Sequence, residues 1–301
     1  MKKILITGGT VFVSKFTAAY FVKKGYQVYV LNRGSRQQVE GVHLICADRN
    51  NLKDQLKDYS FDAVIDVCAY NKEDVKNLLD ALGEFKDYLF ISSSAVYPET
   101  NVQPFTEEQE IGYNNIWTGY GEGKVEAEKY LRDSVPDAYI LRPPYLYGPM
   151  QNVYREAFVF DCAMQKRKFY IPKDGSMKLQ FFHVEDLCRL MEIILETKPG
   201  EHVLNVGNPE AVDINTFVKM CYEVAGEELD KVYVTDHDNQ RDYFCFYDYE
   251  YMLDVSKQSK LLPKTKDLYE GLKESYDWYL AHQGDVNKKD YMKFIDHSFK
   301  N

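Results

Sequence analysis

The chain has 301 residues, of which 45% are apolar, and a formal net charge of −10 at pH 7. This length suits one large or two modest domains with a sizeable core, and the apolar content is typical of a soluble globular protein. The negative charge disfavours broad contacts with nucleic acid or an anionic membrane, and no apolar run reaches transmembrane length.

The cysteines are scattered without metal-ligand spacing, and most of them lie in apolar runs, which predicts reduced core residues of a cytoplasmic protein. They are Cys46, Cys68, Cys162, Cys188, Cys221 and Cys245. The first apolar stretch is too short for a signal peptide. His183 has no partner in sequence at metal-ligand spacing, so we expect a packed core histidine and no metal site.

The first predicted element is a strand over residues 3–7, followed by Gly8-Gly9 and a helix that Gly25 ends. A strand, a glycine turn and a helix form the front of a dinucleotide-binding unit, in which backbone N–H groups face a pyrophosphate. Val11 and Ser14 stand where the dinucleotide pattern has its second and third glycines. An ordinary strand–turn–helix without a ligand is therefore the alternative interpretation.

Strands and helices then alternate, which predicts an α/β fold with a Rossmann-type, doubly wound parallel sheet. The expected strands cover residues 27–31, 42–49, 61–67, 87–94 and 138–142. The expected helices cover residues 52–57, 72–82 (with Gly83 as the stop) and 119–133.

Composition shifts near residues 149–152, where we place the boundary between a dinucleotide-binding domain (1–150) and a smaller α/β substrate domain (151–301). The region 180–206 is expected to fold back onto the first domain through a strand at 202–208. The other elements expected in the second half are helices near 156–166, 214–226 and 266–282, a strand at 169–171, and a polar tail from residue 284.

The strongest catalytic constellation is Ser93, Tyr120 and Lys124. Tyrosine and lysine four residues apart share one helix face, and a nearby ammonium is expected to lower the pKa of the phenol so that it can exchange a proton with a carbinol or carbonyl. Ser93 at the end of the preceding strand would hold that oxygen. The pairs Tyr20/Lys24 and Tyr269/Lys273 share the spacing, but neither follows a serine-bearing strand.

With these residues in view, the chain resembles the extended branch of the short-chain dehydrogenase/reductase family, which includes sugar-nucleotide epimerases, dehydratases and reductases. The resemblance covers nearly the whole chain, and its TGGTxFxG-like turn is similar to an atypical subgroup that also contains plant RNA-binding relatives. The motifs are TGGTVFVS (7–14), ISSSAVYP (91–98), YGEGK (120–124), LRPPYLYGP (141–149), QFFHVEDL (180–187), NVGN (205–208) and the stretch 253–280.

The resemblance implies an NAD(P) cofactor and assigns Ser93, Tyr120 and Lys124 to catalysis, with Lys124 also holding the nicotinamide ribose. It also implies a set of cofactor contacts, in which Asp48 would face the adenine. They are Gly8, Gly9, Thr10, Val11, Phe12, Val13, Asn32, Arg33, Ser35, Arg36, Asp48, Cys68, Ala69, Lys124 and Pro143. The implied substrate contacts are Ser94, Tyr145, Gln180 and Arg241.

Two departures from the family pattern concern the substrate. Leu179 and Gln180 stand where the family often has Arg-Asp, and Tyr145 stands where some epimerases have asparagine. The segment Asn32–Arg36 lacks a carboxylate and holds two guanidinium groups, which favours NADP mildly over NAD, although a solvated basic turn is the alternative.

We therefore expect an NAD(P)-dependent epimerase, dehydratase or reductase acting on a sugar-like or nucleotide-sugar-like small molecule, in a protein that the resemblance allows to be a homodimer. The alternative is a non-catalytic cofactor sensor or RNA-binding protein on the same fold. The Ser93/Tyr120/Lys124 set favours the enzyme, and the replaced glycines favour the binding protein.

Overall fold

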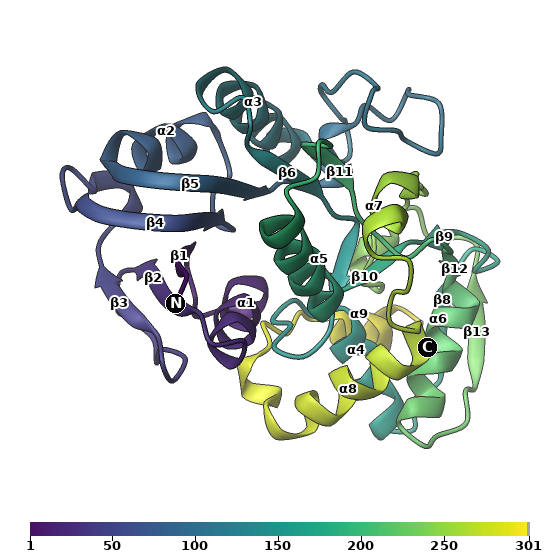
Figure 1. The fold of residues 1–301 in the computed structure, drawn as a ribbon. Coiled ribbons are helices and arrows are strands. Elements are labelled where there is room, and N and C mark those ends of the chain that lie inside the picture. Colours follow the sequence, from purple (N-terminus) through teal and green to yellow (C-terminus); the bar gives the residue numbers. More distant parts are fainter. Residues whose placement is uncertain (300–301) are drawn as a thin grey trace.

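The computed structural model describes residues 1–299, and its centre is a seven-stranded parallel sheet (Figure 1). The strand order is β11-β6-β5-β4-β1-β2-β3, so the chain starts in the middle of the sheet and winds outward in both directions. The bounds are β1 Lys3–Thr7, β2 Gln27–Asn32, β3 His43–Cys46, β4 Leu56–Asp66, β5 Leu82–Ile91, β6 Tyr139–Arg142 and β11 Val203–Asn205. The predicted Rossmann-type fold is confirmed.

Helices cover both faces of this sheet because its strands are apolar on both sides. Alternate residues of β1 show this, since Ile4 and Ile6 pack in one core cluster with α1 and α5, whereas Leu5 packs in the opposite one with α2 and α3. The helix bounds are α1 Phe12–Lys23, α2 Lys72–Ala81, α3 Thr118–Ser134 and α5 Val184–Thr197. The part of the chain that contains this sheet is thus a three-layer sandwich.

A smaller C-terminal part packs around its own core cluster and contains three two-stranded sheets. β10 (Phe181–His183) pairs with β7 (Tyr145–Tyr147), β12 (Val212–Asp213) with β9 (Lys178–Leu179), and β13 (Lys231–Val234) with β8 (Phe169–Pro172). The helices are α4 Glu156–Met164, α6 Ile214–Val224, α7 Ser256–Leu261, α8 Leu268–Ala281 and α9 Tyr291–Ser298. As expected, β11 returns to the first sheet beside β6, while the domain boundary near residue 150 stays a prediction.

Several local predictions are wrong. No helix covers residues 52–57, because a 3-10 turn (Arg49–Asn51) leads directly into β4. Gly83 lies inside β5 rather than ending a helix, and a Cβ at this position would lie 2.4 Å from the carbonyl oxygen of Lys57. The glycine therefore allows close approach of two strands.

The C-terminal tail also differs from the expectation, because it contains α9. Tyr291 and Ile295 of this helix are buried, and the ring of Tyr291 stacks on that of Tyr154 at 6.0 Å between centroids. Two apolar residues four apart were enough to bury one helix face in an otherwise polar segment. None of the helices in residues 1–299 is long and apolar enough to cross a membrane.

A fully buried carboxylate joins the central strands at their carboxyl ends. Asp66, the last residue of β4, accepts two hydrogen bonds from the Arg49 guanidinium, at 2.8 and 2.6 Å. It also accepts hydrogen bonds from the hydroxyls of Thr7, at 2.7 Å, and Tyr88, at 2.8 Å. Although burial opposes ionisation, these partners hold the pKa of Asp66 below its ordinary value.

We therefore predict that Asp66→Asn lowers the free energy of unfolding by about 3–5 kcal/mol, because it leaves the largely buried Arg49 guanidinium with only the more distant Asp74, at 3.7 Å, as counter-ion. The contribution of Asp66 is present above its unfolded-state pKa of about 4 and is lost as the pH falls through the depressed folded-state pKa. Urea unfolding of both proteins from neutral to acid pH measures this difference.

The matched control is Asp80→Asn, which breaks the exposed ion pair between Lys76 and Asp80 within α2. An exposed pair of this kind contributes about 0.3–0.5 kcal/mol. Equal losses in the two variants would contradict the role of Asp66.

Candidate active site

The turn between β1 and α1 requires glycine at two successive positions. Gly8 and Gly9 both have φ of +90°. A Cβ on Gly8 would lie 2.7 Å from Sγ of Cys68, and one on Gly9 would lie 2.6 Å from Cγ1 of Val30. No side chain caps the N-terminus of α1, so its first N–H groups are available to an anion beyond the turn.

The replaced glycines have different consequences. Ser14 is buried, and its Oγ donates a hydrogen bond of 2.9 Å to the carbonyl of Val11. It therefore fills the contact between helix and strand without disturbing the turn. Val11 lines both cavities that flank the turn, so its side chain narrows the space beside the backbone.

The main cavity, of about 470 Å³, lies at the carboxyl ends of the central strands and unites the three predicted catalytic residues with some of the predicted cofactor contacts. Its lining consists of Val11, Phe12, Val13, Ser14, Val67, Cys68, Tyr70, Ile91, Ser92, Ser93, Tyr120, Lys124, Pro143, Pro144, Leu146, Asn152, Val153 and Arg155. The structure thus brings the three catalytic candidates together in one cavity with residues 11–14, which follow the glycine turn.

Tyr120 faces this cavity from α3 and is 44% exposed. Its pKa is raised above 10, mainly because the surrounding protein removes water, while a hydrogen bond with Ser93 acts in the opposite direction. We expected Lys124 to lower the pKa of Tyr120. This expectation is wrong, because the pKa of Tyr120 is raised in the structure.

Lys124 explains the difference. Its Nζ donates hydrogen bonds to the carbonyls of Ala69, at 2.7 Å, and Ile91, at 2.8 Å, and lies 6.0 Å from the centroid of the Tyr120 ring. Burial lowers the pKa of Lys124 to about 8. The lysine is thus an anchored, partly desolvated cation beneath the cavity.

Ser93 and Ser94 have separate roles at the end of β5. Ser93 Oγ accepts a hydrogen bond of 3.1 Å from the backbone N–H of Ala95, which orients it beside Tyr120. Ser94 is buried, and its Oγ donates a 3.1 Å hydrogen bond to the hydroxyl of Tyr251. Ser93 lines the cavity, whereas Ser94 does not.

The segment after β2 is organised by Asn32. Its amide nitrogen donates to the carbonyl of Gly8 at 2.7 Å, and its oxygen accepts from the N–H of Gly34 at 2.9 Å, which ties this loop to the glycine turn. Arg33, Ser35 and Arg36 are exposed. Arg36 also lines a second cavity of about 290 Å³, together with Thr10, Val11, Phe12, Lys15, Gln37, Met150, Asn152, Trp278 and Asp285.

Asp48 lies just after β3 and caps the following 3-10 turn, where its carboxylate accepts the N–H of Asn50 at 2.9 Å. It lines neither of the two cavities beside the glycine turn. Its contact with an adenine stays a prediction.

Three predicted substrate contacts lie behind the cavity wall. Gln180 is buried and bonds to the backbone of Asn208 and Leu253, so its described contacts are structural. Tyr145 is buried, and its hydroxyl has no hydrogen-bond partner within residues 1–299. Arg241 stacks over the ring of Tyr247 at 4.7 Å. None of the three lines the main cavity.

Sequence reasoning missed Asn152, Val153 and Arg155, which line the cavity from the loop before α4. They follow the LRPPYLYGP motif in a segment that we treated only as a domain boundary. The available sequence signal was Arg155, a charged residue that stands directly before the largely apolar α4.

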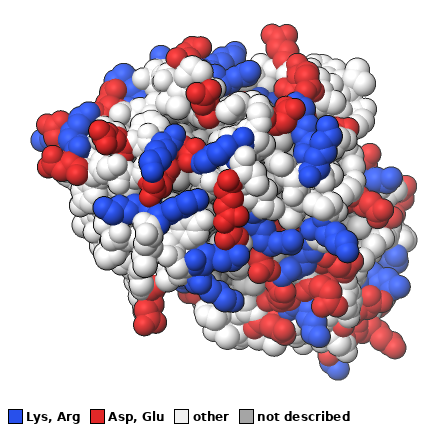
Figure 2. Space-filling model, in the orientation of Figure 1, with Lys and Arg blue, Asp and Glu red and all other residues white. Residues whose placement is uncertain are grey.

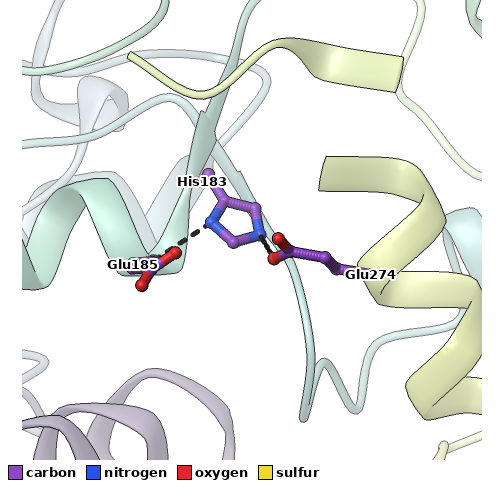
Figure 3. Close-up of side chains that lie close together, drawn as sticks. All are labelled: His183, Glu185 and Glu274. Carbon is purple, nitrogen blue, oxygen red and sulfur yellow. Dashed lines mark hydrogen bonds and ion pairs between the residues drawn. The ribbon is translucent and has the colours of Figure 1, made fainter. Parts of the chain in front are cut away.

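His183 does have carboxylate neighbours, contrary to our expectation, because folding brings Glu185 and Glu274 beside it (Figure 3). The imidazole Nδ1 accepts the backbone N–H of Glu185 at 3.3 Å, so the proton of the neutral ring is on Nε2, which lies 3.4 Å from Glu274. Burial lowers the pKa of His183 to about 3. Lys266 Nζ lies 2.6 Å from both carboxylates and supplies the cation that a metal would otherwise provide.

Comparison with known proteins identifies relatives along most of the chain. The family model described as "NAD dependent epimerase/dehydratase family" matches residues 4–207. A chloroplast stem-loop binding protein of 41 kDa from Arabidopsis thaliana is 28% identical, over 92% of this chain and 79% of that protein. A UDP-glucose 4-epimerase from Corynebacterium glutamicum is 25% identical, over 75% of this chain and 82% of that protein.

The crystal structure of a UDP-glucose 4-epimerase from Thermotoga maritima superimposes with a TM-score of 0.78 at 21% sequence identity. The match covers 93% of this chain and 99% of the other. At this identity the likeness concerns the fold.

The geometry of the turn predicts that Gly9→Ala strongly destabilises the protein and weakens any dinucleotide binding. A positive φ costs an ordinary residue about 1–2 kcal/mol, and the clash with Val30 adds to that cost. Thermal unfolding and calorimetric titration with nicotinamide dinucleotides measure both effects.

Gly25→Ala is the matched control, because Gly25 has a similar φ of +82° but no atom within 4 Å of the added Cβ. We expect it to show only the backbone cost and to leave ligand binding unchanged. If both variants lost the same stability, the packing argument for Gly9 would be wrong.

Proposed function

Because the chain belongs to the NAD-dependent epimerase/dehydratase family, we propose that it is an enzyme that binds a nicotinamide dinucleotide and epimerises, dehydrates or reduces a sugar-like substrate. The observation that carries the proposal is that Ser93, Tyr120 and Lys124 share one cavity with residues 11–14, which directly follow the glycine turn and begin α1. A protein that only bound a ligand would have no need for a proton-transfer group beside that turn.

The residues present fit such a cofactor. Gly8 and Gly9 leave a cradle that a Cβ would fill, and the uncapped N-terminus of α1 offers N–H groups to a pyrophosphate. The Lys124 ammonium would lie beneath the nicotinamide ribose. The dinucleotide supplies hydride chemistry when bound.

In the proposed mechanism, Tyr120 gives a proton to, or takes one from, the oxygen at the reacting carbon. Ser93 holds that oxygen by a hydrogen bond, and its own orientation is set by the N–H of Ala95. Lys124, anchored to the carbonyls of Ala69 and Ile91, would hold the cofactor ribose and not act directly on the phenol. Filling the cavity would exclude water from around these groups.

We further propose that the cofactor is NADP rather than NAD. No carboxylate ends β2, and Arg36 and Lys15 both line the smaller cavity beside the glycine turn. The same cavity is also lined by the acidic Asp285, but the two cations outnumber it and suit a ribose 2′-phosphate.

The alternative function is RNA binding, and it is favoured by the relative whose name describes stem-loop binding and by the replacement of two glycines. The charge distribution argues against it. The net charge is −10, and Figure 2 shows acidic and basic side chains interspersed over the visible face instead of a basic stripe.

The central test is Tyr120→Phe, which removes only the phenol oxygen and keeps the ring. We expect turnover to fall by a factor of about 10²–10⁴ or more, while unfolding temperature and cofactor affinity stay nearly unchanged. Assays with NADPH, NADH and a panel of sugars and nucleotide sugars provide the readout.

Tyr269→Phe serves as the control, because Tyr269 is also four residues before a lysine but lies on α8, outside both cavities. Retention of wild-type turnover by Tyr120→Phe would refute the proposed mechanism and favour the binding-protein alternative.

The cofactor proposal predicts that Arg36→Asp shifts the ratio of NADP to NAD affinity toward NAD by about tenfold or more, since a cation is replaced by a group that repels the 2′-phosphate. Arg33→Asp changes charge equally on the same loop but does not line the smaller cavity, so we expect a smaller shift. Fluorescence titration with NADPH and NADH compares the variants. If the ratio of NADP to NAD affinity were unchanged in Arg36→Asp, Arg36 would not bind the 2′-phosphate.

A further inference from the structure

The smaller cavity joins two segments that are far apart in the sequence. Its N-terminal side includes residues 10–12 and Lys15 from the start of α1, and Arg36 from the loop after β2. Its C-terminal side includes Trp278 of α8 and Asp285 of the 3-10 turn that follows. In Figure 1 the yellow segment that contains α8 passes beside α1. The family match ends at residue 207, so it assigns no role to this C-terminal side.

The smaller cavity adjoins the main cavity, since Val11, Phe12 and Asn152 line both. A dinucleotide consists of two nucleotides joined by a pyrophosphate, which suits a site at the N-terminus of α1, where Phe12 lies. Under the proposed function, the nicotinamide half belongs in the main cavity beside Tyr120. The adenosine half then extends into the smaller cavity toward Arg36.

The indole of Trp278 is held in a fixed orientation at this cavity. The side chain is half-buried and packs against the core cluster of the C-terminal part. Its ring stacks on that of His282, with 4.8 Å between the centroids and 4° between the planes. Nδ1 of His282 donates a 2.8 Å hydrogen bond to the carbonyl of Trp278. The cavity is thus bordered by a large apolar ring whose position is set before any ligand binds.

The helix that carries this ring is itself fixed near both ends. Just before α8, Lys266 bonds to the carboxylates of Glu185 and Glu274, at 2.6 Å each, and so ties α8 to α5. Near the other end, Tyr279 is buried, and its hydroxyl is hydrogen-bonded to α4 at 2.7 Å. Trp278 therefore belongs to a preformed wall and not to a lid, so ligand binding has little ordering entropy to overcome.

Two cations line the smaller cavity together with Trp278. Lys15 is half-buried and Arg36 is exposed, and neither forms an ion pair within residues 1–299. Asp285 is the single acid among the described lining residues, so the charge of the cavity favours an anion. An apolar ring near these cations keeps water away from a bound phosphate, which strengthens the attraction between them.

We propose that Trp278 is a cofactor-binding residue, whose indole covers the adenosine ribose and the pyrophosphate of the dinucleotide. Lys15 and Arg36 then face the phosphates of that half from the N-terminal side. This inference rests on the proposed function, because it requires a bound dinucleotide. The site thereby includes the C-terminal helix α8, whereas every cofactor contact expected from the sequence lies within residues 8–143.

The first test is calorimetric titration of the full-length protein with NADP⁺, NAD⁺, ADP and nicotinamide mononucleotide. Trp278→Ala should weaken binding of the three probes that contain adenosine about tenfold or more, because the apolar cover of the phosphates is lost. Trp278→Phe, which keeps a smaller ring, should lie between. Binding of nicotinamide mononucleotide should not change, because it occupies the main cavity, which Trp278 does not line.

Leu280→Ala is the matched control, since Leu280 is an exposed apolar residue of the same helix and lines neither cavity. It should bind all four probes like the wild type. Unfolding temperatures of all variants separate binding losses from loss of fold.

The second test uses the fluorescence of the two tryptophans of the chain, Trp117 and Trp278. Trp117→Phe leaves Trp278 as the single tryptophan, and saturating NADP⁺ should reduce the quenching of its fluorescence by acrylamide. In Trp278→Phe, the remaining Trp117 lines neither cavity, so its quenching should not change. A residue with a merely structural role would not be shielded by the ligand.

Three results would overturn the inference. They are wild-type affinity of Trp278→Ala for ADP and NADP⁺, an equal loss of affinity for nicotinamide mononucleotide and ADP, and unchanged quenching of Trp278 in the presence of NADP⁺. Failure of the proposed function is distinguishable, because a wild type that binds none of the four probes would overturn both proposals. A wild type that binds them while Trp278→Ala binds them equally well would overturn this inference alone.

Discussion

The buried ion pair between Asp66 and Arg49 is the constraint on which the site depends. The Thr7 hydroxyl donates to Asp66 and accepts the N–H groups of both Val67 and Cys68, at 2.9 and 3.0 Å. The last residue of β1 is thereby locked to the loop that follows β4. Gly8 begins the turn immediately afterwards, so the position of the cofactor cradle is set by a network that is itself closed to solvent.

A second buried network supports the catalytic side of the cavity. Arg142 of β6 bonds to Glu128 of α3, with its closest contact at 2.6 Å, and Glu128 accepts the hydroxyl proton of Ser92. Arg142 also donates to the hydroxyl of Tyr97, which donates to Asn205 of β11. Lys124 lies one helical turn before Glu128, so the network fixes the helix that carries Tyr120 and Lys124 against the end of β5.

The two functional hypotheses depend on different parts of this structure. The glycine turn has kept the positive φ values and the close approaches that a pyrophosphate site requires, even though Val11 and Ser14 have replaced glycines. The proposed catalytic residues, a serine, a tyrosine and a lysine, lie in one cavity, whose charged lining residues are Lys124 and Arg155. A purely RNA-binding protein would not need these groups to be enclosed together.

The sequence by itself determined the order of strands and helices, the glycine turn and the grouping of Ser93, Tyr120 and Lys124, because these follow from local spacing and from the rule that parallel strands end at one edge. Only the tertiary structure decided the pKa shifts of the site residues and the contacts between residues that are far apart in the sequence. The pKa of Tyr120 is raised because the surrounding protein removes water, and the Arg155 guanidinium lies over the rings of Tyr145 and Phe246, which come from other segments. Glu274, on α8, lies 3.4 Å from Nε2 of His183 although the two residues are far apart in the sequence. Such contacts depend on how separate elements pack, and local periodicity carries no information about that packing.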